Sequence, residues 1–212
     1  MSQNTSLLDS VILVDETDHP IGTMDKYEAH RNGGHLHRAI SVYLFAKVQG
    51  KWQLLIQQRS PQKIVGGKMW ANTVCGNVRP GESYRECATR RLREELGLQQ
   101  STIEATGLEA IYTFQYAVKC NEEFSEREID RVFVGQVRAT EVASLLVPNT
   151  SEVIATDWID FMQLVNDARE QDWRPENTVV YKDKKMAPWF VWMVRDESLV
   201  SILQQTLQEQ TK

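Results

Sequence analysis

A chain of 212 residues with 42% hydrophobic and 25% charged residues has the composition of one globular domain or at most two, which excludes disordered, collagenous and coiled-coil proteins. Its net charge of −5 leaves no excess of Lys and Arg for nucleic-acid binding, and no apolar run is long enough to span a membrane. Because no repeat, linker or basic leader marks a boundary, we expect a single domain over residues 1–212, located in the cytoplasm and of unknown oligomeric state.

Apolar segments along the chain predict a mixed sheet packed between helices. Short runs rich in β-branched and aromatic residues predict strands at 11–14, 39–46, 52–57, 70–74, 111–118, 131–137 and 156–159. Helical patterns predict helices at 161–167, at about 189–208 and at 82–96, the last with Gly97 as its C-cap. Strands interrupted by one long helix and followed by further helices indicate an α+β or α/β architecture.

Residues 76–98, GNVRPGESYRECATRRLREELGL, form the segment most suited to chemistry. On a helix Arg91 and Glu95 share a face, so one interpretation is an exposed helix with ion pairs four residues apart. The turn before the helix favours a ligand site instead. It places Cys75 and two glycines where backbone can approach a ligand, next to carboxylates suited to Mg²⁺.

This segment resembles the Nudix box, a glycine followed by a glutamate-rich helix. The matching positions are Gly76, Glu82, Arg90, Leu92, Glu94, Glu95, Gly97 and Leu98. Arg91 stands where the box has its first metal-binding Glu on the helix, a substitution found in the type 1 isopentenyl-diphosphate isomerases of the Nudix superfamily. The resemblance implies a Nudix-like α+β fold, in which a mixed sheet packs between helices.

The resemblance to these isomerases extends from about residue 22 to residue 189. The segments that carry it are GTMDKYEAH, HLHRAISVYLF, LLIQQRSPQK, MWANTVCG, SEREIDRVF and APWF, in this order. It implies an enzyme that interconverts isopentenyl and dimethylallyl diphosphate by protonation and deprotonation, with a small-molecule diphosphate as its partner.

Two histidines and two glutamates are candidate metal ligands. His30 and His37 flank a Gly-Gly turn, and Glu126 and Glu128 point to one face if their segment is a strand. From the pattern alone these residues are more readily surface groups, because EEFSEREID is rich in charge. The resemblance implies a metal site, in which Asn77 replaces the third histidine of the family, so Mn²⁺ or Zn²⁺ binding is possible but weakened.

Migration of a double bond needs one group that adds a proton and one that removes it. The resemblance implies that Cys75 and Glu128 are these two groups, that Trp189 faces the developing positive charge and that Tyr116 hydrogen-bonds the glutamate. Each has a structural alternative, because buried cysteines and aromatic residues usually belong to the core. Three cysteines without a CxxC pair do not form a disulfide framework, and Cys87 and Cys120 match no catalytic position.

The resemblance also implies a binding site for the diphosphate. Its residues are Lys26, Arg59, Lys63 and Arg91, with Glu95 as the carboxylate that holds Mg²⁺. His19 and His35 match nothing and are expected on the surface.

Two other functions stay open at this point. Glu94 and Glu95 together fit a Nudix hydrolase that cleaves a diphosphate, and Asn77 fits a Nudix-fold binder that has lost its metal. The joint presence of Cys75, Glu128 and Trp189 favours the isomerase, because hydrolysis of a phosphoanhydride does not require them.

Overall fold

The structure is a computed structural model that describes residues 9–138, 144 and 146–209. Its first half contains β1 (Ser10–Val14), β2 (Pro20–Asp25), α1 (Lys26–His30), β3 (His37–Val48), β4 (Lys51–Arg59), β5 (Trp70–Ala71), β6 (Val74–Asn77), α2 (Tyr84–Leu96) and α3 (Gln100–Ala105). The second half contains β7 (Glu109–Lys119), β8 (Ser125–Gln136), β9 (Val153–Asp160), α5 (Phe161–Glu170), β10 (Val180–Tyr181), β11 (Lys184–Lys185), α6 (Pro188–Arg195) and α7 (Glu197–Glu209). Residues 1–8, for which we expect no basic leader, lie outside the described residues.

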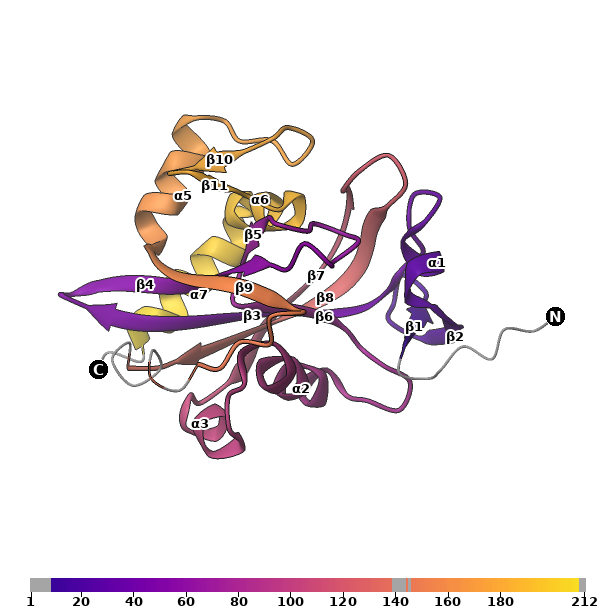
Figure 1. Ribbon diagram of the computed structural model, residues 1–212, viewed down its shortest axis with the longest axis horizontal. Coiled ribbons are helices and arrows are strands. Elements are labelled where there is room, and N and C mark those ends of the chain that lie inside the picture. Colours follow the sequence, from indigo (N-terminus) through magenta and orange to yellow (C-terminus); the bar gives the residue numbers. More distant parts are fainter. Residues whose placement is uncertain (1–8, 139–143, 145, 210–212) are drawn as a thin grey trace.

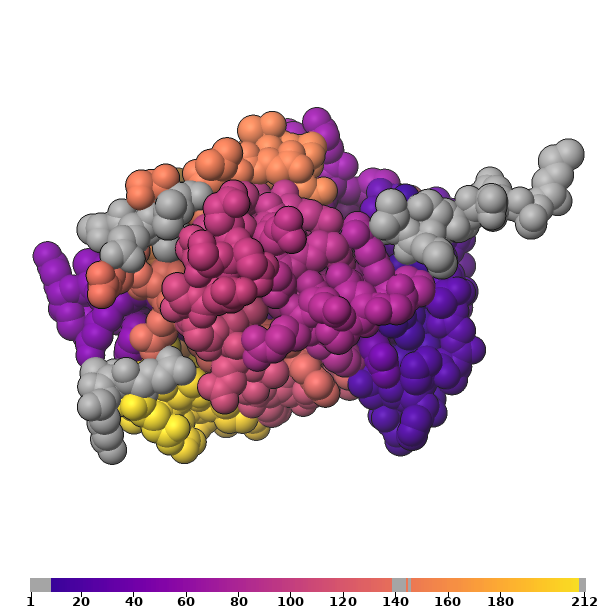
Figure 2. Space-filling model, turned by 90° about the horizontal axis from the view of Figure 1, so that it is seen from below, coloured from indigo at the N-terminus to yellow at the C-terminus, as the bar shows by residue number. Residues whose placement is uncertain are grey.

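The mixed sheet between helices is confirmed. Strand β3 pairs with β8 in parallel and with β1, β4 and β6 in antiparallel orientation. Figure 1 shows α2 and α3 on one side of this sheet and α5, α6 and α7 on the other. Seen from the side of α2 and α3, these two helices cover the middle of the face, between the N-terminal strands and α7 (Figure 2).

Alternation along β3 builds a core on each side of the sheet. Ile40, Val42 and Leu44 pack into the cluster beneath α2, whereas Tyr43 and Phe45 pack into the cluster beneath the C-terminal helices. Such a strand must be apolar on both faces, which explains why the sequence reads as a continuous hydrophobic run.

Several element boundaries differ from the sequence-based expectations. The strand expected at 70–74 is two short strands, β5 and β6, separated by Asn72 and Thr73. The helix expected at 189–208 is α6 and α7, which meet at Asp196, where a carboxylate oxygen accepts a hydrogen bond from the Leu199 amide at 2.7 Å.

Helix α2 begins at Tyr84 rather than at residue 82, because Ser83 and Glu86 form a capping box. It ends at Gly97 as expected, in a left-handed conformation with φ of 69°. Strand β8 begins at Ser125, six residues before the expected start, since its charged first half faces the interior. The short elements β2, α1, α3, β10 and β11 were not expected, because too few residues carry a periodic pattern.

In the described part of the chain, each helix is too short or too polar to span a lipid bilayer.

Candidate active site

A cavity of about 570 Å³ lies where β6, β8, α1 and α2 meet. All but two of the site residues expected from the sequence line this cavity. Those on the lining are Lys26, His30, Arg59, Lys63, Cys75, Asn77, Arg91, Tyr116, Glu126, Glu128 and Trp189. His37 and Glu95 are not on its lining, but each contacts a residue that is. Residues spread over more than 160 positions of the chain therefore share one cavity.

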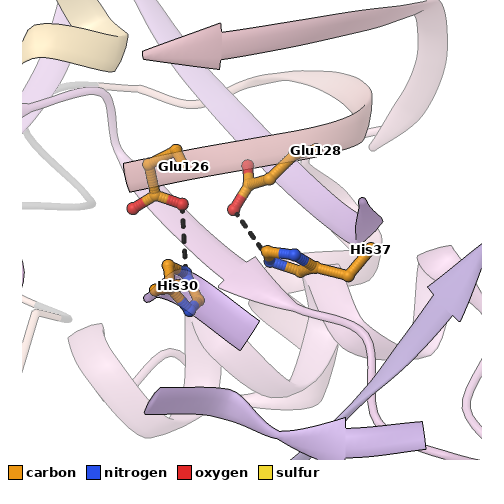
Figure 3. A group of neighbouring side chains, drawn as sticks. All are labelled: His30, His37, Glu126 and Glu128. Atoms are coloured by element: carbon orange, nitrogen blue, oxygen red, sulfur yellow. Dashed lines mark hydrogen bonds and ion pairs between the residues drawn. The ribbon is translucent and has the colours of Figure 1, made fainter. Parts of the chain in front are cut away.

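Two histidines and two glutamates converge at one end of the cavity. One ligand atom from each of His30, His37, Glu126 and Glu128 lies within 4.8 Å of the others. Both glutamates extend from the same face of β8 toward the histidines, as Figure 3 shows. Nε2 of His30 lies 3.1 Å from Glu126 Oε2, and Nε2 of His37 lies 3.4 Å from Glu128 Oε1.

Backbone carbonyls fix which nitrogen of each histidine faces the cluster. Nδ1 of His37 donates to the carbonyl of His35 at 2.7 Å, and Nδ1 of His30 donates to the carbonyl of Lys26. With both Nδ1 atoms used as donors, the two Nε2 atoms point at the carboxylates. This is the way in which metal-binding histidines are held in proteins.

Burial and mutual charge set the protonation of the cluster. Burial and the positive charge of His30 lower the pKa of His37 to about 4, so this imidazole is neutral. Burial would raise the pKa of Glu126, but His30 lowers it below its ordinary value. Burial and the charge of Glu126 raise the pKa of Glu128 well above its ordinary value.

The four side chains fit a divalent cation. Among the described residues, none offers a hydrogen-bond partner to the buried Nε2 of His37. A neutral imidazole with a free lone pair and two carboxylates that repel each other are the donor set of a metal site. Asn77, at the end of β6, lines the same cavity as His30, Glu126 and Glu128.

The Cys75 thiol and the Glu128 carboxyl line the cavity from two strands on either side of β3. Cys75 pairs with Ser41 across one edge of β3, and Glu128 pairs with His37 across the other. The two flanking strands lie about 10 Å apart, and the register also offsets the two residues by four positions along β3, so their side chains enter the cavity from separate points of its wall. Burial raises the pKa of the Cys75 thiol, which is therefore protonated at neutral pH.

Aromatic residues complete this part of the wall. The Tyr116 hydroxyl donates a 2.7 Å hydrogen bond to Glu128 Oε2, and its ring packs on Trp192 with a centroid distance of 5.4 Å. Trp189 is 3% exposed, and the Arg59 guanidinium lies 5.2 Å from the centre of its ring. A Cβ at Gly66 would lie 2.3 Å from the indole, so only glycine fits there.

Positive charges gather at the other end of the cavity. Lys63 and Arg91 both bind the carboxylate of Glu152, and the distance from Arg91 Nη2 to Glu152 Oε2 is 2.8 Å. Arg91 also pairs with Glu95, whose second oxygen accepts a 2.6 Å hydrogen bond from Gln57 Nε2. The exposed helix pair is therefore a wrong interpretation, because the Arg91 side chain is only 13% exposed and that of Glu95 only 1%.

Lys26 lies apart from this group at the cavity rim, where its ammonium is 3.2 Å from Asp9. The structure thus places all four expected cations on one cavity, but in the described structure only Lys63 and Arg91 share a carboxylate partner. His19 and His35 are exposed, as expected.

Sequence reasoning missed acidic residues of the cavity, among them Asp130 and Glu152. Asp130 follows Glu128 on the same face of β8 and accepts a 2.7 Å hydrogen bond from Ser41 Oγ. Its signal was the third alternate position of EREID, which extends the pair at 126 and 128. Glu152 lies just before β9 in a polar loop, where no periodic pattern distinguishes it.

Comparisons with known proteins agree on the family. The sequence model of the NUDIX domain matches residues 35–183. A protein of Pectobacterium atrosepticum named isopentenyl-diphosphate Delta-isomerase is 39% identical over 69% of this chain and 79% of its own length. A Salmonella heidelberg protein of the same name is 33% identical over 88% of this chain and 91% of its own length.

Solved structures show the same fold. DR0079 from Deinococcus radiodurans superposes with a TM-score of 0.63 at 22% identity, over 88% of this chain and 97% of that one. The Nudix hydrolase RenU from M. smegmatis superposes with a TM-score of 0.52 at 18% identity, over 82% of this chain and 92% of that one.

Proposed function

The chain belongs to the NUDIX domain family and, within it, to the isopentenyl-diphosphate Delta-isomerases, and we propose that it interconverts isopentenyl and dimethylallyl diphosphate by adding a proton at one carbon and removing one at another. The observation that carries this proposal is the presence, in one cavity, of two proton-carrying groups from opposite sides of β3, next to a buried indole and a group of cations.

Cys75 and Glu128 are the proposed acid and base. The Cys75 thiol, which burial keeps protonated, donates its proton to an alkene carbon. Glu128, on the other flanking strand, would be ionised with a divalent cation held beside it, and its carboxylate then removes a proton from the neighbouring carbon. The Tyr116 hydroxyl orients this carboxylate through the hydrogen bond to Oε2. Exchange with solvent returns both groups to their starting states. The overall change moves one double bond, so the number of protons on the substrate stays the same.

Trp189 stabilises the charge that protonation creates. Protonation of the alkene gives a tertiary cation, which the face of an aromatic ring attracts by about 0.5 to 2 kcal/mol when water is excluded. The ring is held in place by Gly66 on one side and by packing within the C-terminal core. Because the buried ring is already fixed in position, it attracts the cation without a rearrangement of the protein during the reaction.

The diphosphate is proposed to bind at the cationic end of the cavity. Arg91 and Lys63 would exchange Glu152 for phosphate oxygens, with Arg59 and Lys26 as further donors. The exchange would also free Glu95, now paired with Arg91, to hold the Mg²⁺ that accompanies a diphosphate.

A second divalent cation would be held by His30, His37, Glu126 and Glu128, with the amide of Asn77 beside them. Bound there, it would supply positive charge that steadies two neighbouring carboxylates and fixes the orientation of Glu128. An amide oxygen in place of an imidazole favours Mg²⁺ or Mn²⁺ over Zn²⁺.

We further propose that the whole chain is one unit that works in the cytoplasm on a free small molecule. A reducing compartment keeps Cys75 a thiol, which the proton chemistry requires.

Proton NMR of isopentenyl diphosphate incubated with the protein tests the function, because one spectrum separates dimethylallyl diphosphate from dephosphorylated products. We expect the isomer without phosphate release, and loss of at least about 10²-fold in rate for Glu128→Gln. Release of phosphate without isomerisation would identify a hydrolase, and an unchanged substrate would support a binder.

A further inference from the structure

Asn72 lies in the bend between β5 and β6 and is completely buried. Its Nδ2 donates two hydrogen bonds, to the carbonyl of Val42 at 3.2 Å and to the carbonyl of Val74 at 3.0 Å. Its Oδ1 accepts a hydrogen bond from the Cys75 thiol, with an Sγ to Oδ1 distance of 2.9 Å. The side chain therefore joins the central strand to the thiol that faces the cavity.

The orientation of this amide is determined by its surroundings. If the amide were reversed, Oδ1 would face two carbonyl oxygens, and both contacts would change from hydrogen bonds to repulsion. Oδ1 must therefore face Cys75. An oxygen that can only accept requires the sulfur to be the donor, so the contact fixes the direction of the S–H bond.

Another polar atom near the thiol is Ser41 Oγ, 3.8 Å from Sγ. Ser41 donates its own hydrogen to Asp130 Oδ2 at 2.7 Å, so it does not offer a hydrogen to the sulfur. The distances favour Asn72 as the acceptor of the thiol hydrogen, since a contact of 3.8 Å is weak even for sulfur.

We propose that Asn72 is a positioning residue for Cys75, which fixes the rotamer of the thiol by accepting its hydrogen. This inference rests on the proposed function in taking Cys75 as a group that exchanges a proton with the substrate. The spacing of three residues fits the bend, because Asn72 is its first residue and a side chain at that position can reach Cys75 at the start of β6.

Thr73 provides a matched control. It is the other residue of the bend, is equally buried, and its hydroxyl links the amide of Leu44 to the carbonyl of Leu55 at 2.9 and 2.6 Å. Thr73→Val removes these two hydrogen bonds without a contact to the thiol. A structural role in the bend predicts similar effects for Asn72 and Thr73, whereas a role in positioning the thiol predicts an effect for Asn72 alone.

The test is infrared spectroscopy of the S–H stretch, whose frequency falls when the thiol donates a hydrogen bond. Spectra of Cys75→Ala, Cys87→Ala and Cys120→Ala assign the three bands in the folded protein. We expect the Cys75 band at the lowest frequency, because its acceptor is at 2.9 Å, compared with 3.4 Å for Cys87 and 3.8 Å for Cys120. A Cys75 band at or above the other two would overturn the proposal even if no variant of Asn72 folds.

Asn72→Leu should move the Cys75 band to the frequency of a free thiol, whereas Thr73→Val should leave it in place. In kinetic assays Asn72→Leu should lower kcat about five- to tenfold, the effect of one lost hydrogen bond, with a smaller change in KM. A band that shifts equally in both variants would overturn the proposal. The spectra do not depend on turnover. A protein that fails to isomerise would therefore refute the proposed function, while the S–H frequencies would still test the role of Asn72.

Discussion

Arg91→Ala should destabilise the protein as well as weaken diphosphate binding. The change leaves the carboxylate of Glu95, which is 1% exposed, with Gln57 as its remaining hydrogen-bond donor in the described structure. Breaking a buried ion pair by removing one partner costs about 3 to 5 kcal/mol, and the contact with the 38% exposed Glu94 adds little. We therefore expect the free energy of unfolding to fall by about 3 kcal/mol and Tm to fall by about 6 to 12 °C.

Urea denaturation measures this loss, and Arg93→Ala is the control on the same helix. Arg93 is exposed, so its removal should change the free energy of unfolding by less than about 0.5 kcal/mol. The double variant with Glu95→Gln should recover part of the loss, since the uncompensated charge is then absent. A loss below about 1 kcal/mol for Arg91→Ala, equal to that of the control, would show that the pair is solvated and refute this reasoning.

Three further predictions concern single residues of the cavity. Cys75→Ala should lower the isomerisation rate at least about 10²-fold while Cys87→Ala stays close to wild type, and equal rates in the two variants would contradict the assignment of the thiol. Asn77→His should tighten Mn²⁺ or Zn²⁺ binding by about 10- to 100-fold in titrations of metal-stripped protein, whereas equal affinities would speak against Asn77 as a ligand position. Burial would raise the pKa of Glu152, but Lys63 and Arg91 lower it to about 2. A carboxyl whose pKa is lowered by folding stabilises the fold at pH values above its unfolded pKa of about 4.3. This stabilisation is lost as the pH falls toward about 2. At pH 7 the free energy of unfolding of the wild type should thus be about 2 kcal/mol higher than that of Glu152→Gln. This difference should disappear between about pH 4 and pH 2. A difference that does not depend on pH would refute the role of the two cations.

The segment from residue 76 to residue 98 could be predicted because its information is local. Gly76 is required by a close approach, since a Cβ there would lie 2.6 Å from Arg91 Cγ, and Gly97 is required by its positive φ. Such constraints act within one turn and one helix, so they leave a readable spacing in the sequence. The partners of Arg91 were less readable, because Glu152 reaches it from 61 residues away.

The metal cluster shows the same limit. Alternation alone indicated that Glu126 and Glu128 share a face, and the structure confirms it. That His37 meets Glu128 follows from the pairing of β3 with β8, and His30 reaches Glu126 from α1 across 96 residues; no local pattern contains either contact. Only the resemblance to a family could place these residues together before the fold was known.

Breaks within elements were missed for a related reason. Asn72 and Thr73 interrupt a run that reads as one strand, and their side chains replace the missing backbone ladder with bonds to β3 and β4. Asp196 likewise divides an apolar helical pattern by capping α7. In both cases a polar side chain ends the regular element, although the hydrophobic pattern continues on both sides of it.

The most direct measurement is NMR of isopentenyl diphosphate incubated with the protein in D₂O. If separate groups add and remove the protons, solvent deuterium should enter the dimethylallyl product, and Glu128→Gln should abolish both the isomer and the label. Product that carries no deuterium would contradict proton exchange through Glu128 and Cys75. Phosphate release without the isomer would contradict the proposed function altogether.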